Sequence, residues 1–219
     1  MEFDHRFRGG FGIGISMKVT QGARHPIRHY LEKELETEVV CDGCTLRYAI
    51  YGVFGWCPDC GVHNSLQILA KNLELARKEL ALATTADLEL ANHLIGDALE
   101  NAVSTFDGFG REICMQKSAD IHFQNLFGAR RRVQGKFGFD FADALTADQW
   151  DCACRVFQKR HLLAHKMGVI DDEYLQKAND KTAVLGRKVS LNHDEVESAI
   201  SIVEAMGQRL FTGVLPAIP

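Results

Sequence analysis

Two Cys-x-x-Cys pairs constrain this chain more than any other feature: Cys41 with Cys44, and Cys57 with Cys60. Each pair places two sulfurs on one tight turn, and two such turns supply the four thiolates of a tetrahedral structural zinc site. Twelve residues separate the pairs, a length that suits one hairpin joining them. The spacing therefore predicts one Zn²⁺ bound by Cys41, Cys44, Cys57 and Cys60.

The residues around the cysteines predict a small β module. Thr45–Trp56 is rich in aromatic and β-branched residues and predicts a strand, a turn and a second strand. Four cysteines fill the zinc shell and leave no position for water, so we expect a structural zinc, not a catalytic one. His63 is close in sequence, but we expect a polar loop residue and not a ligand. Residues 36–64 resemble a zinc ribbon, and whether this ribbon also contacts nucleic acid or a partner stays open.

After residue 64 the apolar residues recur with helical spacing, which predicts a bundle of about four main helices. Thr85 and Thr146 are the expected caps of two of them. We expect helices at residues 66–83, 86–106 (or on towards 116), 118–131, 147–166 and 193–211. Residues 169–190 are predicted to be mostly loop.

The predicted fold class is mainly α: an up-and-down helical bundle with a small N-terminal β zinc-ribbon module. We divide the chain into three segments. Residues 1–35 form a Gly-rich lead-in with a short helix that starts at Pro26 and reaches Glu38. The zinc ribbon occupies 36–64 and the bundle 65–219.

Charge and hydropathy narrow the function classes. The net charge of the 219 residues is −4, so no global basic surplus favours a polyanion partner or a zinc-ribbon transcription accessory. No apolar run approaches the roughly 18 residues of a membrane span, and the start does not read as a secretory signal. We therefore expect a cytoplasmic protein with no membrane partner. The other three cysteines, expected as buried thiols in helices, fit a reducing compartment: Cys114, Cys152 and Cys154.

Two local basic runs stand out against this balance. The first is Arg130, Arg131 and Arg132, followed by Lys136, and the second is Arg155, Lys159, Arg160 and Lys166. Either run alone is typical of a solvated helix face.

Arg160, His161 and His165 fall in one predicted helix and carry the chemistry of metal-free RNA cleavage. That reaction needs a base, an acid and a cation on the phosphate. Histidine titrates near neutral pH, and the arginine fork matches a phosphate. At about 100° per residue, His161 and His165 lie about 40° apart, whereas Arg160 lies about 140° from His165. One helix therefore presents an incomplete site, which two copies facing across a dimer axis would complete.

This segment resembles the motif of the HEPN family: Arg160, then four residues beginning with the polar His161, then His165, near the end of the third helix of an all-α bundle. The resemblance covers roughly residues 85–211. It implies an endoribonuclease that leaves a 2′,3′-cyclic phosphate and a homodimer with the site between subunits. Arg160 would bind the phosphate, His165 would transfer the proton, and His161 would orient the site or assist.

Such enzymes often serve as toxins or in phage defence, and an antitoxin or regulatory partner is then expected. Some members carry a Tyr two residues after the His, where a partner enzyme modifies them. Met167 stands there in this chain, which argues against that control.

Other interpretations remain open. A non-catalytic RNA-binding or scaffold protein could use the same ribbon and bundle, and a buried His165 would favour it. His161 lies in an apolar stripe and by itself suits a core or interface histidine. His161 and His165 at i,i+4 make half a metal site, but no carboxylate completes it within the motif. We expect structural zinc as the cofactor, none for catalysis, and RNA and a second copy as partners.

Overall fold

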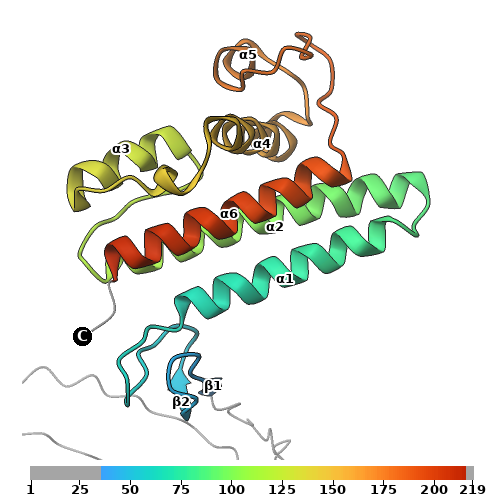
Figure 1. The fold of residues 1–219 in the computed structure, drawn as a ribbon. Helices are drawn as coiled ribbons and strands as arrows, with labels where there is room; N and C mark the ends of the chain where they lie inside the picture. Colours follow the sequence, from blue (N-terminus) through green and yellow to red (C-terminus); the bar gives the residue numbers. More distant parts are fainter. Residues whose placement is uncertain (1–35, 216–219) are drawn as a thin grey trace, which may run out of the picture. The chain divides into compact units, whose positions relative to one another are not determined.

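The structure, a computed structural model, describes residues 36–215, which are mainly helical with a two-stranded antiparallel sheet near the cysteine pairs (Figure 1). This confirms the predicted fold class. The elements are β1 (Glu36–Val40), β2 (Arg47–Tyr51), α1 (Ser65–Ala83), α2 (Leu88–Met115), α3 (Leu126–Phe137), the 3₁₀ turn η1 (Phe141–Ala144), α4 (Ala147–Lys166), α5 (Asp172–Lys177) and α6 (His193–Val214).

Three long helices, α1, α2 and α6, lie side by side, and α4 crosses α2 and α6 (Figure 1). The apolar stripe predicted for α1 is buried, with Leu69, Leu73 and Leu80 each at most 1% exposed. Phe106 of α2 anchors an aromatic cluster, because the rings of Phe123, Phe141 and Phe157 lie within 6.3 Å of its ring centroid. These contacts fix α4 against α2, which positions the motif helix.

The helix starts differ from two predictions. Asp87, not Thr85, caps α2, because its carboxylate accepts from the Leu90 N–H at 2.9 Å. Thr85 instead donates its hydroxyl to Leu82 O at the end of α1, at 3.1 Å. The helix continues through Asp107 and Gly108 to Met115, the longer of the two predicted lengths.

The helix predicted at residues 118–131 is wrong in position, because α3 runs from Leu126 to Phe137. Asn125 caps it by accepting from Gly128 N at 3.1 Å. The residues before Asn125 are not helical: the buried Asp107 carboxylate accepts from the Phe123 N–H at 2.5 Å and holds this segment against α2. The predicted cap of α4 is correct, and Thr146 and Gln149 form a capping box.

The sheet of the ribbon also differs from its prediction. β1 pairs with β2 around the first cysteine pair, from Glu36 opposite Tyr51 to Val40 opposite Arg47. No hairpin of two strands joins the two pairs within the described part. Glu36–Glu38 is strand and not the end of a helix. The rest of that expected helix, and the lead-in before it, lie outside the described residues.

The predicted loop at 169–190 contains the short helix α5, and Met167 and Gly168 end α4 in the left-handed region, with φ of 54° and 77°. Across residues 36–215, no helix combines the length and apolar character that crossing a bilayer requires.

Candidate functional site

The four predicted ligands converge, with one sulfur from each lying within 4.8 Å of the others: Cys41, Cys44, Cys57 and Cys60. The two turns close in the same way, because Thr45 N donates to Cys41 O at 2.8 Å and Gly61 N donates to Cys57 O at 2.9 Å. Gly61 has a φ of 68°, which favours glycine at this turn. The cluster has the donor set and compactness to hold one metal ion.

Neighbouring groups act on the pKa values of these thiols in opposite directions. The backbone N–H of Leu46 lowers the pKa of Cys44, but burial and hydrogen bonds with the other sulfurs raise it further, to about 12. Burial raises the pKa of Cys57, yet the backbone N–H groups of Cys60 and Asp59 bring it down to about 7. Full ionisation of the cluster therefore calls for a cation that binds thiolates, because unscreened like charges would repel.

His63, expected to be a polar loop residue, is not part of the four-cysteine cluster, and it is buried, with only 2% of its surface exposed. Its ring packs on Trp56 with centroids 4.8 Å apart. Its Nδ1 accepts from Ser65 N at 3.4 Å, and its Nε2 lies 3.6 Å from a carboxylate oxygen of Glu112. His63 therefore links the ribbon to α1 and α2, and burial lowers its pKa.

The second candidate site lies between α2 and α4 and is built around Arg160. The Arg160 side chain is 11% exposed and grips the Glu100 carboxylate with two hydrogen bonds, Nε to Oε2 at 2.6 Å and Nη2 to Oε1 at 2.5 Å. Nη2 also approaches the Ser104 hydroxyl at 3.4 Å. Within residues 36–215, Nη1 makes no hydrogen bond, so one edge of the fork keeps its donors.

The two histidines lie close to each other, and the charge of His165 acts on the Glu100 carboxylate. His165 is exposed and His161 is half-buried, with ring centroids 5.0 Å apart. Burial raises the pKa of Glu100, but hydrogen bonds from Arg160 and Ser104 and the charges of Arg160 and His165 bring it below its usual value. Burial, and then the nearby charges of His165 and Lys166, lower the pKa of His161, which favours its neutral form.

His161 and His165 thus lie close to each other, and Arg160 contacts Glu100 and Ser104, two residues that the sequence analysis missed. Glu100 is one of many acidic residues on helix surfaces, and nothing in its local sequence distinguishes it. The exposure of His165 removes the observation that would have favoured a scaffold. In the described part of the chain, no third His, Cys, Asp or Glu side chain joins His161 and His165 in a metal-sized cluster.

The rest of the second basic run is paired with acids from other elements. Lys159 is 7% exposed and donates to Glu195 of α6 at 2.8 Å. Arg155 also approaches Glu195, and Lys166 pairs with Asp171. The expectation of a solvated face is therefore wrong for Lys159 and Arg160, which lie inside the bundle.

Comparison of the chain with known proteins finds no match: no family model, no curated protein and no solved structure corresponds to it. The resemblance to the HEPN family therefore rests on the motif and on its place in a helical fold.

Proposed function

We propose that the chain is a metal-independent endoribonuclease of the HEPN type, with its site at Arg160, His161 and His165. One observation carries the proposal: Glu100 holds the Arg160 fork with two hydrogen bonds, and the charge of the exposed His165 acts on the same carboxylate. A pre-oriented cation next to a proton-transfer group is the minimum equipment for moving a phosphoryl group without a metal.

In the proposed reaction the RNA 2′-oxygen attacks the adjacent phosphorus, and the bond from phosphorus to the 5′-oxygen breaks. The 2′-hydroxyl proton passes to a base and the leaving 5′-oxygen takes up a proton, which yields a 2′,3′-cyclic phosphate. His165 transfers the proton, and Arg160 stabilises the charge on the phosphate oxygens with its remaining donors. His161, held towards its neutral form, orients the site or accepts a proton.

We propose zinc as the ion of the four-cysteine cluster, in a structural role. Four thiolates around a compact centre suit Zn²⁺ and leave no open position for substrate. The contacts of His63 with Trp56 and Glu112 then connect the ribbon to α2 of the bundle.

The site is proposed to be completed in a homodimer. Arg160 and His165 from one chain supply one cation and one exposed histidine, whereas the reaction needs both a base and an acid. Exposed apolar side chains surround the motif: Leu163 is 40%, Met167 82% and Val169 38% exposed. A second copy covering them would bury this surface and bring a second His165 to the cleft.

The test is RNA cleavage by Arg160→Ala and His165→Ala beside wild type, in EDTA. Matched controls are Arg77→Ala, another partly buried arginine paired with acids, and His122→Ala, another exposed histidine. We expect each motif change to lower the rate by roughly 10²–10⁴-fold and the controls to leave it unchanged. Light scattering should report a dimer.

Equal activity in wild type and His165→Ala would refute the proposal, as would cleavage that stops in EDTA and returns with Mg²⁺. The alternative is a non-catalytic RNA-binding or scaffold protein, and the neutralisation of Arg160 by Glu100 is the observation in its favour. It predicts RNA binding with no cleavage by any variant. A ribonuclease of this kind would act as a toxin or phage-defence effector, and its expression should arrest growth only when Arg160 and His165 are intact.

A further inference from the structure

The first basic run, on α3, stays mostly exposed to solvent, whereas the second is paired with acidic residues. Helix α3 contains four cations and no acid, in a chain whose net charge is −4. Arg131, Arg132 and Lys136 are exposed, and none of them forms an ion pair within residues 36–215. Their positive charge therefore remains on the surface, where Coulomb attraction to a polyanion is available.

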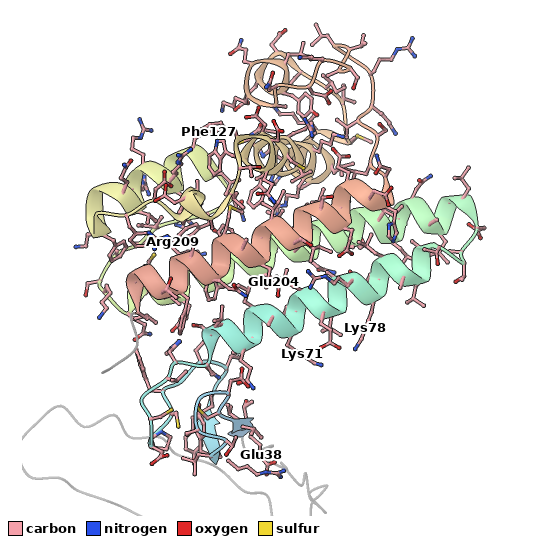
Figure 2. The ribbon with its side chains drawn as sticks, in the orientation of Figure 1. Glu38, Lys71, Lys78, Phe127, Glu204 and Arg209 are labelled. Atoms are coloured by element: carbon pink, nitrogen blue, oxygen red, sulfur yellow. The ribbon has the colours of Figure 1, made fainter. Side chains whose placement is uncertain are left out.

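An exposed aromatic ring lies on the same helix. Phe127 is 48% exposed and stands one turn before Arg131, so the two side chains share a face. Figure 2 shows Phe127 where α3 approaches α4. Its ring and that of Trp150 form a T-shaped pair, with centroids 5.7 Å apart.

Trp150, on which Phe127 packs, is itself held by a further contact. The Arg130 guanidinium lies 4.5 Å over the Trp150 ring and pairs with Asp140 at 2.6 Å. Arg130 thus contacts Trp150, the residue under Phe127. The other three cations of the first basic run, Arg131, Arg132 and Lys136, face solvent. A solvated helix face explains the cations. The packing of Phe127 on Trp150, with Arg130 over the same indole, adds an aromatic ring beside them on which a base can stack.

We propose that the α3 surface, defined as Phe127, Arg131, Arg132 and Lys136, binds single-stranded RNA. Arg132 and Lys136 lie about 140° and 180° around α3 from Phe127, so the strand curves around the exposed side of the helix. The three cations contact phosphates and Phe127 stacks on a base, the combination by which proteins hold unpaired nucleic acid. Trp150 precedes His161 by eleven residues, about 16 Å along α4. A strand held at α3 can therefore extend along α4 to the motif. This inference deepens the proposed function and rests on it for RNA as the substrate.

The experiment measures binding of a fluorescent single-stranded RNA, and of a duplex of equal length, to the full chain carrying His165→Ala. The first variant adds Arg131→Gln and Arg132→Gln. Its matched control adds Lys71→Gln and Lys78→Gln, which remove the same charge from α1, where Figure 2 shows both lysines well away from Phe127. A third variant adds Phe127→Ala, and thermal unfolding verifies that each chain is folded.

We expect the Arg131 and Arg132 changes to reduce the slope of log affinity against log salt by about 0.7 per lost phosphate contact, about 1.4 together, with no change in the control. Phe127→Ala should weaken binding of the single strand by about 5- to 150-fold, and of the duplex much less. Equal losses in the α3 variant and the control would mean that only net charge matters, and would overturn the inference. So would unchanged binding in the α3 variants, or a preference for anionic vesicles over RNA.

The proposed α3 surface and the proposed nuclease can be refuted independently of each other. Wild-type cleavage of RNA with no effect of the α3 changes on binding refutes the α3 surface and leaves the nuclease standing. Binding that depends on α3, together with no cleavage by wild type, supports the α3 surface and refutes the nuclease.

Discussion

Replacing Glu100 by Gln tests the contact on which the proposed site depends. Gln keeps the size of the side chain but removes the charge, and it offers one acceptor oxygen where Arg160 now uses two. The Arg160 side chain, 11% exposed, would keep its charge with too few partners. We therefore expect Glu100→Gln to destabilise the fold and also to slow RNA cleavage, because the fork is no longer held in place.

The expected loss in the free energy of unfolding follows from how exposed Arg160 and Glu100 are. Breaking a fully buried ion pair costs about 3–5 kcal/mol, and an exposed pair contributes about 0–1 kcal/mol. Arg160 is nearly buried, but the Glu100 side chain is 41% exposed, so water partly replaces the lost carboxylate. We expect a loss of about 1–3 kcal/mol in the free energy of unfolding.

The assay is urea unfolding of wild type, Glu100→Gln, Arg160→Met and the double variant, which form a double-mutant cycle. Arg160→Met removes the charge that Glu100 satisfies, so the double variant should recover most of the loss, with a coupling energy of about 1–3 kcal/mol. A coupling energy below about 0.5 kcal/mol would refute the reasoning, because the pair would then contribute nothing in solution.

The Glu100–Arg160 pair also makes the stability of the fold depend on pH, and the direction of this dependence can be predicted. The pKa of Glu100 is lowered from 4.5, because the hydrogen bonds and positive charges around it outweigh its burial. A lowered folded-state pKa stabilises the fold above the unfolded value, and this stabilisation is lost as the pH falls through the folded value. The difference in stability between wild type and Glu100→Gln should therefore be full above pH 4.5 and shrink below it.

Two further predictions concern the ribbon and the packing of α2. Cys57→Ser should abolish zinc binding and loosen residues 36–64, measured by native mass spectrometry and hydrogen exchange, because the hydroxyl is a poor substitute for a thiolate; a wild-type chain that is folded and zinc-free would contradict this. Gly96→Ala should stabilise the fold by about 1 kcal/mol, since nothing lies within 4 Å of the added methyl group. Gly110→Ala should destabilise it by about 1–3 kcal/mol, because the added methyl group meets the buried Phe123 ring at 2.5 Å. Urea unfolding would contradict the packing argument if both changes had the same sign.

The features that the sequence predicted correctly are those set by neighbouring residues. The four cysteines converge because each turn is built within five residues, from Cys41 to Thr45 and from Cys57 to Gly61. The start of α4 was predictable for the same reason, since its capping box involves residues three apart. Local chemistry of this kind does not depend on how the bundle packs.

The position of α3 depended on a distant contact. Residues 118–125 contain apolar side chains at spacings that a helix also allows, so periodicity placed the helix too early. Phe123 is fully buried against Phe106 and Phe141, and its N–H is bound by Asp107 of α2. Burial of that ring, together with the Asn125 cap, outweighed the local preference and moved the helix to Leu126.

The two basic runs show why site residues are harder to predict than elements. Both runs have four cations on or near one helix, and sequence alone gave them the same interpretation. The second is neutralised because α4 crosses α2 and α6 where Glu100 and Glu195 stand. No such acid stands opposite Arg131 or Arg132 within the described residues, so their charge stays on the surface. Which arginine becomes a fixed part of a site, and which remains available to a ligand, is therefore decided by the crossing of helices.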